Sequence, residues 1–500
     1  ALSCILVPMG NNPAAFQNFQ QDAARVLDTS VASLGALAGI VTDGPQAARL
    51  GELIAKHDFP ALLRALTSRG TRLPPDFFPT WIRKAGGYFP KFAQVLSVRA
   101  DLIDDPEVLA GLGQCLEDMP VRSKDDLRRI LRQQGWNQAC DGLGEALNAG
   151  TVAQVNNMML AGGFAVVKVT FPDVRSRFVT DFRLFSHARS ILKALDLRDE
   201  KAQIVGAMFE AVGKSEAHVL QEFDLTCDAS AMRRVMEALD EWPDAYEAWK
   251  AAAEQMVRSD SVGVPAHILP LLQVAREQSS RWQIKVPQAV NGYVAQSALI
   301  MTLAGGQSLH ELVGRDAASQ QEAAMVFLGF ALPFIGWLLL CKSTSHLAHV
   351  DPHFGNFRWQ RESETLWILD WGSTVRLHEE RRLSLCLLVS CIAANAEDET
   401  IAAVARDFGV SGENDAQVAN VVCGLFNASS HQAAQESIEH AAADSLLQNI
   451  RDEVVPVVRC LAILGGTLKK IQQQIRADHD QHLPLSLAHL WQPFAATGLA

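Results

Sequence analysis

His349-Val350-Asp351-Pro352-His353-Phe354-Gly355-Asn356 is the most informative stretch of this chain, and Leu369-Asp370-Trp371-Gly372 follows it. Between the two stretches, residues 356–360 and 365–369 have the short apolar runs of a β-hairpin. Asp351 and Asn356 are therefore expected on a loop that leads into a strand. Asp370 is expected at the end of the second strand of the hairpin.

These residue types suit the transfer of a phosphoryl group from a nucleotide. That reaction needs a carboxylate near the acceptor and oxygen ligands that hold Mg²⁺ on the phosphates. Asp351 and Asn356 have the spacing H-x-D-x-x-x-x-N of a kinase catalytic loop, and Asp370 stands where kinases have the D-F-G aspartate. We expect Asp351 to be catalytic and Asn356 and Asp370 to bind Mg²⁺. In the competing interpretation, Asp351 and Asn356 are turn residues and Asp370 caps the next helix.

A lysine inside an apolar strand extends the pattern. Residues 152–160 and 164–171 predict a second hairpin, in which Ala165-Val166-Val167-Lys168-Val169 is similar to the V-A-I-K strand of kinases. A buried ammonium is costly unless an anion pairs with it, so we expect Lys168 to be catalytic and to bind the nucleotide. The alternative is an edge-strand lysine that faces water. The strand 297–303 predicts a nucleotide contact at Met301, in an adenine-binding hinge. Ala149, Gly150 and Thr151 stand where kinases have a Gly-rich loop over the nucleotide, although this loop has a single glycine.

The composition is that of a folded globular chain. Its 500 residues are 48% hydrophobic and 20% charged, enough for two or three domains or for one large catalytic domain with extensions. The 44 Lys and Arg against 56 Asp and Glu give a net charge of −12, which disfavours electrostatic binding of nucleic acid. The nine cysteines include no C-x-x-C pair, so we expect a reducing compartment and no disulfide framework.

Two further features allow more than one interpretation. The segment 323–341 contains no charged residue and is long enough to span a bilayer, but we favour a buried helix next to the site. His346, His349 and His353 are spaced like metal ligands, but Pro352 breaks the helix that would align them, which argues against zinc.

From about Pro79 to Leu468, the chain resembles the UbiB (aarF-domain) family of atypical kinases. Besides the two stretches quoted first, the resemblance is carried by Lys91-Phe92-Ala93-Gln94 and Glu222-Phe223-Asp224. In that family, the K-x-G-Q segment folds across the active site and its lysine approaches an E-x-D pair. The resemblance therefore implies regulatory roles for Lys91, Gln94, Glu222 and Asp224.

The same resemblance assigns a partner to the strand lysine. It implies that Asp228 pairs with Lys168 and helps to bind the nucleotide, although the family has a glutamate there, which is longer by one C–C bond. Ala93 and Phe354 stand where the family has Gly and Pro, and Asn148-Ala149-Gly150-Thr151 stands where it has the nucleotide loop A-A-A-S.

The implied fold is α+β and protein-kinase-like, with two lobes, a helical N-terminal extension and a helix-rich C-terminal lobe. We predict a helical extension at 1–75 and a helical segment with the K-x-G-Q-like motif at 76–140. The small lobe would span 141–306 with a helical insertion at about 237–281, and the large lobe 307–500.

The implied function is that of an atypical kinase or ATPase with ATP and Mg²⁺ as cofactors, acting in quinone or isoprenoid-lipid metabolism or its regulation. Its implied partners are the nucleotide, membrane lipid and quinone-pathway proteins. Its implied location is a bacterial cytoplasm, mitochondrion or plastid, at the periphery of a membrane. Two alternatives stay open. Leu369-Asp370-Trp371-Gly372 also resembles small-molecule phosphotransferases of the aminoglycoside-kinase type, and the altered nucleotide loop fits a catalytically weak pseudokinase.

Overall fold

The computed structural model describes much of the chain in detail. The described residues are 43–56, most of 80–93, 121–160, 162–194, 213, 216–258, 282–342, 347–412, 414–428, 450–479 and 486–499. Internal contacts divide the chain into two units. The first unit contains residues 1–120, 149–152 and 171–216, and the second contains 121–148, 153–170 and 217–500.

Two helices form the larger described part of the first unit. Helix α4 (Gly44–Lys56) packs against α11 (Pro172–Ala194). A buried ion pair joins them, with Arg49 Nε 2.7 Å from Asp181 Oδ1. Because both side chains are almost fully buried, each needs the other as its partner.

The short helical segment within 80–93 packs on the same carboxylate. The Tyr88 backbone N–H donates to Asp181 at 2.9 Å, and the Tyr88 ring meets Phe178 edge-on. Gly87 has a φ of +61°, and a Cβ at this position would lie 2.1 Å from Asp181 Oδ2. The turn before Tyr88 therefore requires a glycine.

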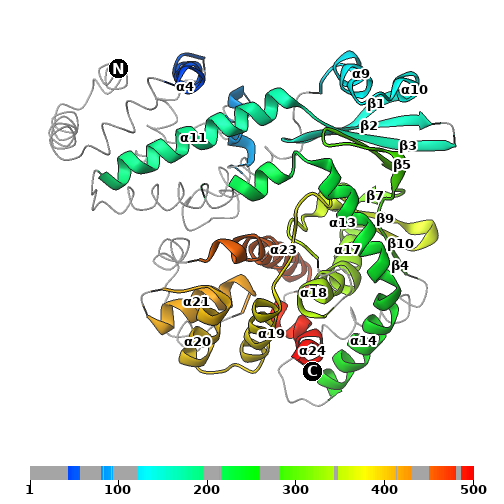
Figure 1. Cartoon of the computed structure of the whole chain (residues 1–500). Helices are drawn as coiled ribbons and strands as arrows, with labels where there is room; N and C mark the ends of the chain where they lie inside the picture. Colours follow the sequence, from blue (N-terminus) through cyan, green and yellow to red (C-terminus); the bar gives the residue numbers. More distant parts are fainter. Residues whose placement is uncertain are drawn as a thin grey trace. The chain divides into compact units, whose positions relative to one another are not determined.

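The second unit contains a five-stranded sheet in the order β1-β2-β3-β6-β5 (Figure 1). Its strands are β1 (Leu143–Ala149), β2 (Ala153–Leu160), β3 (Gly163–Thr170), β5 (Ala289–Val294) and β6 (Ala298–Thr302). The central strand β3 is rich in valine, which favours a strand packed on both faces. Its antiparallel register places Lys168 between Val155 of β2 and Leu299 of β6.

A second sheet contains the predicted hairpin and has the order β4-β10-β9-β7. Strands β9 (Phe357–Gln360) and β10 (Thr365–Ile368) are antiparallel, β4 (Gln283–Lys285) is parallel to β10, and β7 (Gln307–Ser308) is antiparallel to β9. A two-stranded ladder pairs β8 (Ala348–His349) with β11 (Thr374–Val375). Since β8 precedes residues 350–356 and β11 follows 369–373, this ladder brings the two motif loops together.

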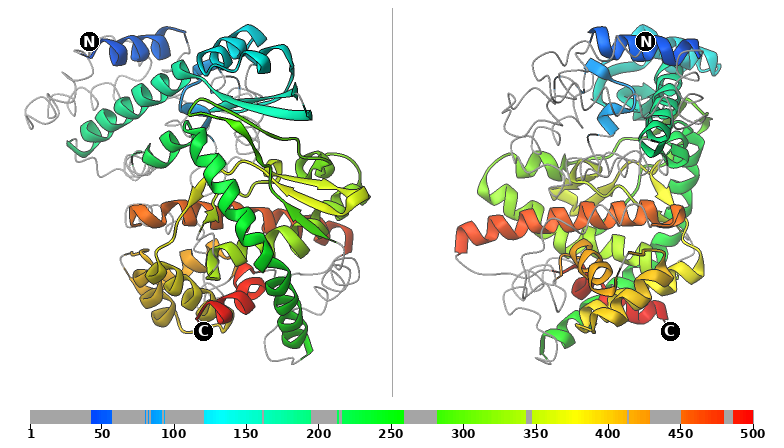
Figure 2. Two further views of the ribbon diagram at one scale, coloured as in Figure 1. Left: turned by 45° about the vertical axis from the view of Figure 1, so that its right-hand side comes forward. Right: turned by 90° about the vertical axis from the view of Figure 1, so that its left-hand side faces the viewer.

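Helices make up most of the remaining described second unit. Those before Ala348 are α9 (Lys124–Gln133), α10 (Asn137–Asp141), α13 (Leu225–Ala238), α14 (Trp242–Arg258), α16 (Leu309–Val313), α17 (Ala317–Val326) and α18 (Leu332–Leu340). Those after it are α19 (Glu379–Ala393), α20 (Asp398–Phe408), α21 (Asp415–Leu425), α23 (Val455–His479) and α24 (Leu487–Leu499). Single 3₁₀ turns occur at Leu239–Glu241, Phe354–Asn356, Arg361–Ser363 and Asp452–Val454. Helices α19, α20 and α21 form one group, and α24 packs on α19 (Figure 2).

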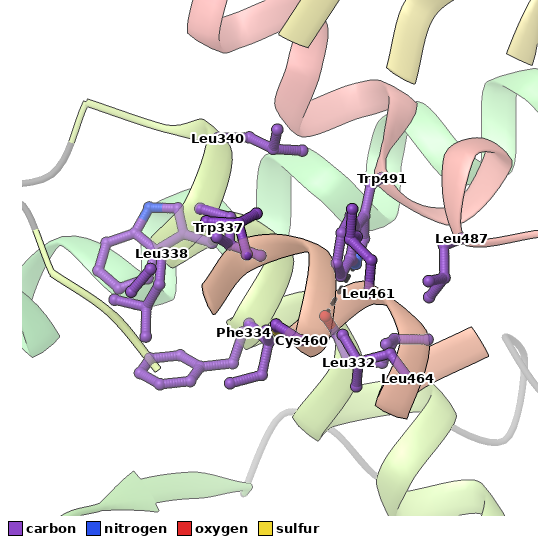
Figure 3. Close-up of a cluster of buried hydrophobic side chains, with 14 of the residues drawn as sticks. Leu332, Phe334, Trp337, Leu338, Leu340, Cys460, Leu461, Leu464, Leu487 and Trp491 are labelled. Carbon is purple, nitrogen blue, oxygen red and sulfur yellow. Dashed lines mark hydrogen bonds between the residues drawn. The ribbon is translucent and has the colours of Figure 1, made fainter. Parts of the chain in front are cut away.

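The long apolar helix of the second unit is Ala317–Leu340, which consists of α17, a π-helical turn (Phe327–Ala331) and α18. By length and composition it is the one described helix that could cross a membrane, but 89% of its apolar window is buried within the chain. Its C-terminal part contributes to a cluster with α23 and α24 (Figure 3). This burial agrees with the predicted core helix.

The mixed α+β organisation predicted from the sequence is confirmed, as are both hairpins and the strand at 297–303. Strands β1, β4 and β5 and the two-residue strands β7, β8 and β11 were not predicted. Residues 1–42 and 259–281, which hold much of the predicted N-terminal extension and of the predicted insertion, lie outside the described residues. The predicted domain boundaries stay predictions.

Candidate active site

Lys168 lies between two carboxylates that come from distant parts of the chain. Its ammonium is 2.7 Å from Asp228 Oδ1 and 2.6 Å from Asp370 Oδ1. β3 supplies the lysine, α13 supplies Asp228, and Asp370 follows β10 closely. The Asp228 side chain is 3% exposed and that of Asp370 is 48% exposed, so one partner is fully buried and the other faces solvent.

Burial and charge act in opposite directions on this group of three residues. Burial by itself lowers the pKa of Lys168, but the negative charges of Asp228 and then Asp370 outweigh it and hold this pKa above its usual range. Burial raises the pKa of Asp228 to about 6, against the lowering by Lys168. The ammonium is therefore fully charged at neutral pH and holds the buried carboxylate in its ionised form.

The glycine of Asp370-Trp371-Gly372 makes room for the buried carboxylate. A Cβ at Gly372 would lie 2.8 Å from Asp228 Oδ2. That oxygen has no hydrogen-bond partner among the described residues. Asp228 is shorter than the glutamate implied by the resemblance, yet its Oδ1 contacts the Lys168 ammonium at 2.7 Å.

His349 fixes the start of the catalytic-loop motif. Its ring is fully buried, its Nε2 lies 3.0 Å from the Leu369 carbonyl, and the Asp351 backbone N–H donates to its Nδ1 at 3.3 Å. This pattern assigns the proton to Nε2. Burial lowers the pKa of His349, so the ring is neutral at pH 7. Both ring nitrogens are engaged in these hydrogen bonds, which leaves neither for a zinc ion; His346 lies outside the described residues.

Asn356 connects the two motif loops. Its side-chain N–H donates to the Asp351 carbonyl at 2.9 Å, and its own backbone carbonyl accepts from the Leu369 N–H at 2.8 Å. The second bond places Asn356 beside the residue that precedes Asp370. Asp370 itself has a φ of +52°, a strained backbone conformation that aspartate tolerates better than most residues.

The oxygens of Asn356 and Asp370 are of the chemical kind that binds a magnesium ion. The amide nitrogen of Asn356 is used by the Asp351 carbonyl, which leaves the amide oxygen as the polar atom suited to a cation. Carboxylate and amide oxygens are hard ligands of the kind that Mg²⁺ prefers. Within the part of the chain that the structure describes, no group of three or more His, Cys, Asp or Glu side chains could hold a metal ion. An ion here would therefore take its remaining ligands from phosphate oxygens and water.

Two contacts at this site involve residues that the sequence interpretation missed. Arg459 Nη2 of α23 lies 3.0 Å from Asp351 Oδ1. The Ser373 hydroxyl donates to Glu222 Oε1 at 2.9 Å, and the Ser373 carbonyl accepts from the Val350 N–H. No motif marks Arg459 or Ser373, and both become visible only when distant segments pack together.

The other predicted residues have these positions. Glu222 is buried with Ser373 as described, and Asp224 is the N-cap of α13, where it accepts from the Thr226 N–H at 3.1 Å. Met301 lies in β6 opposite Val166 of β3. In the first unit, Ala149 is the last residue of β1, Gly150 and Thr151 lie in the turn that leads to β2, and Lys91 is buried. Gln94 lies outside the described residues.

Comparisons with known proteins show which family this region resembles. The family model described as the ABC1 atypical kinase-like domain matches residues 272–434, which include Asp351, Asn356 and Asp370. A curated relative from Xylella fastidiosa (strain 9a5c), named "Probable protein kinase UbiB", is 23% identical over 257 residues. A protein of the same name from Xanthomonas campestris pv. campestris (strain B100) is 26% identical over 262 residues. Each match covers 46% of this chain and 46% of the relative, so the match spans about half the length of these relatives.

A solved structure shows a more distant similarity. It is that of Rv3197 with erythromycin from Mycobacterium tuberculosis, with 14% sequence identity and a TM-score of 0.39 over 83% of this chain and 94% of that chain. The α+β, kinase-like fold class predicted from the sequence is confirmed by the family model and by the mixed sheets and helices. The resemblance that the motifs carry is supported as well: residues 272–434 match the family model of the ABC1 atypical kinase-like domain, and less than half of the chain is similar to proteins named UbiB.

Proposed function

We propose that this chain binds Mg²⁺-ATP and transfers its γ-phosphoryl group to an acceptor hydroxyl or to water. The observation that carries the proposal is the buried Lys168 ammonium, which contacts Asp228 and Asp370 while Asn356 ties the Asp351 loop to the Asp370 loop. This arrangement unites a phosphate-binding cation, two oxygen ligands for a metal ion and an acceptor-side carboxylate. Those are the parts that phosphoryl transfer requires.

Each residue has a separate task in this proposal. Lys168 neutralises phosphate oxygens, and Asp228 keeps the ammonium charged and in place. Asn356 and Asp370 would hold Mg²⁺, which when bound neutralises charge on the phosphates. Asp351 orients the acceptor. As the acceptor oxygen bonds to the γ-phosphorus, the bond from phosphorus to the β-phosphate oxygen breaks, ADP leaves, and the acceptor proton passes to Asp351.

The first test measures nucleotide binding without assuming an acceptor. Saturation with Mg²⁺-ATP at about 100 times Kd adds roughly 2.7 kcal/mol to stability, which raises the unfolding temperature by a few degrees. We expect this shift to need Mg²⁺ and to disappear in Asp370→Asn. Absence of a shift in the unmodified protein would contradict the proposal.

The second test separates turnover from binding. Asp351→Asn should keep the Mg²⁺-ATP stabilisation, because Asp351 is not placed on the phosphates, and should lower turnover by about 10²- to 10⁴-fold. If Asp351→Asn changes nothing and the unmodified protein releases no phosphate with any acceptor, the pseudokinase alternative is favoured. Turnover with soluble hydroxyl acceptors would favour the small-molecule phosphotransferase.

The metabolic setting is proposed from the resemblance and from the UbiB relatives. We infer a role in quinone or isoprenoid-lipid metabolism or its regulation, with membrane lipid or proteins of that pathway as partners. Flotation of the protein with neutral and with anionic liposomes tests the membrane association. Recovery in the unfloated fraction with both lipid types would count against it.

A further inference from the structure

Arg459 is the residue through which α23 reaches the catalytic-loop motif. Its Nη2 lies 3.0 Å from Asp351 Oδ1, although 108 positions separate the two residues in sequence. The side chains are 22% and 9% exposed, so water screens this ion pair far less than a surface pair. Charge-assisted hydrogen bonds of this kind are short and directional.

The turn of α23 that carries Arg459 is anchored in the core. The neighbouring Cys460 lies 3.6 Å from the His349 carbonyl and donates its S–H to it. Leu461 and Leu464 belong to the apolar cluster with Leu332 and Trp491 that Figure 3 shows. Consecutive residues of one helix therefore contact both ends of His349-Val350-Asp351, which fixes the guanidinium relative to the loop.

Three other hydrogen bonds of Asp351 hold its backbone. Its N–H donates to His349 Nδ1, and its carbonyl accepts from the Asn356 side chain and from the His353 N–H at 2.9 Å. These bonds do not act on the carboxylate. The pair with Arg459 does, because a planar guanidinium bound to Oδ1 restricts the rotation of the carboxylate and thereby the direction of its second oxygen.

We propose that Arg459 is a positioning residue for phosphoryl transfer that acts through Asp351. By binding Oδ1 it holds the second oxygen in the direction from which the acceptor hydroxyl or water is aligned with the γ-phosphorus. This inference rests on the proposed function, since Asp351 orients an acceptor only in an enzyme that turns over. A misplaced catalytic group costs up to about 10²-fold in rate, which sets the scale of the effect.

The test compares Arg459→Met with Arg459→Lys in steady-state turnover of Mg²⁺-ATP. Arg459→Met should lower kcat by about 10- to 100-fold while KM for Mg²⁺-ATP changes by less than about 3-fold, because the phosphate-binding residues are untouched. Arg459→Lys keeps the charge without the planar fork and should recover part of the loss. In the Asp351→Asn background, Arg459→Met should have less than about a 2-fold effect on residual turnover, since its target is already gone.

Arg406→Met is the matched control, because Arg406 pairs with Asp415 on the neighbouring helices α20 and α21. Its kcat should equal that of the unmodified protein. If Arg459→Met does not fold, Arg459→Gln and Arg459→Lys replace it, and the fold of each variant is checked by its urea midpoint.

The outcomes decide separately on the two proposals. Absence of turnover in the unmodified protein overturns the proposed function and this role with it. Turnover that is unchanged in Arg459→Met, or a loss in which KM for Mg²⁺-ATP rises as much as kcat falls, overturns the positioning role and leaves the proposed function standing. A loss of kcat alone that Arg459→Lys partly restores supports it.

Discussion

Removal of the Lys168 ammonium is the perturbation whose effect on the free energy of unfolding follows most directly from the structure. In Lys168→Met, a side chain of similar length fills the same space in β3 without a charge. Asp370 is half exposed and regains water, whereas Asp228 is 3% exposed and has one oxygen already without a partner among the described residues. The loss of stability in the variant therefore comes mainly from Asp228, which stays buried without its cationic partner.

The magnitude follows from leaving a buried charge without its partner. Breaking a buried ion pair by removing one member costs about 3–5 kcal/mol. Burial already raises the pKa of Asp228 to about 6 while Lys168 opposes the rise, so the pKa will increase further in the variant. Above pH 7 the folded variant must either keep a buried carboxylate or take up a proton.

The raised pKa of Asp228 also fixes the sign of the pH dependence. In the unfolded chain, aspartate titrates near 3.9, so between this value and the raised folded pKa the folded state binds more protons. Stability from this group then falls as pH rises. Between pH 7.5 and 5.5 the variant should regain about 1–2 kcal/mol more than the unmodified protein, because its folded pKa lies higher.

The assay is urea unfolding at both pH values for three variants. Lys168→Met should lose about 3–5 kcal/mol at pH 7.5. Lys168→Met combined with Asp228→Leu should recover to within about 1 kcal/mol of the unmodified protein, because no buried charge remains. Lys124→Met is the control, since Lys124 lies at a similar 2.6 Å from Glu145 but the pair is exposed, and its loss should stay below about 1 kcal/mol.

One result would refute the reasoning directly. If Lys168→Met costs no more than Lys124→Met at pH 7.5, and its stability does not rise on acidification, then Asp228 does not depend on the ammonium for compensation. The ion pair would then contribute little to the stability of the sheet.

Three further predictions concern other parts of the second unit. Gly372→Ala should destabilise the protein by about 1–3 kcal/mol and weaken its stabilisation by Mg²⁺-ATP, because the added Cβ would lie 2.8 Å from Asp228 Oδ2. Urea midpoints measure the first effect and thermal shifts the second. A variant as stable as the unmodified protein would contradict the close approach. Tyr246→Phe should cost about 1–3 kcal/mol, since it removes the 2.6 Å bond to the Gly329 carbonyl in the buried π turn; a loss below about 0.5 kcal/mol would show that this carbonyl finds another donor. Burial lowers the pKa of His489, and a hydrogen bond to the Ala393 backbone opposes this lowering. On acidification His489 is therefore protonated in the unfolded chain before it is protonated in the folded protein. The free energy of unfolding then decreases as pH falls below about 6.5, by up to about 1.4 kcal/mol per pH unit. His489→Gln should abolish that part of the slope in urea midpoints between pH 7.5 and 5.5, and an unchanged slope would exclude His489 as its source.

Short-range spacing in the sequence was sufficient to locate those candidate site residues that lie within a single loop, hairpin or strand. Asp351 and Asn356 lie on one loop, Asp370 follows the attached hairpin, and Lys168 stands out as a charge in an apolar strand, so short-range patterns locate all four. Asp228 came only from the resemblance, because a single acidic residue in a helix has no local signal. Arg459 could not be predicted, since nothing in 455–479 distinguishes its charge from an ordinary helix-surface charge.

Two of the strands that were missed, β1 and β5, share a physical cause. β1 has the sequence Leu143-Gly-Glu-Ala-Leu-Asn-Ala149, whose leucine, alanine and glutamate favour helix, yet the chain is extended there because it pairs with β2. β5 contains Gly292 at φ +84° and an irregular register with β6, which removes the strict alternation that marks a strand. Tertiary pairing overrides local propensity in both cases.

Packing decides between two interpretations of the long apolar helix, a membrane span and a buried core helix, which its length cannot separate. An amphipathic helix leaves one face in water, whereas the apolar window of Ala317–Leu340 is covered by other elements of the chain. Gly336 lies in close contact with one of these covering elements, because a Cβ there would lie 2.5 Å from the Trp491 ring. The Nε1 of that ring donates to the Leu332 carbonyl at 3.0 Å. The glycine admits the indole of α24 to the helix backbone, as Figure 3 shows for Leu332 and Trp491. In a helix that faces lipid, that glycine would have no such partner, so the small residue at 336 is explained by contact with α24 within the chain.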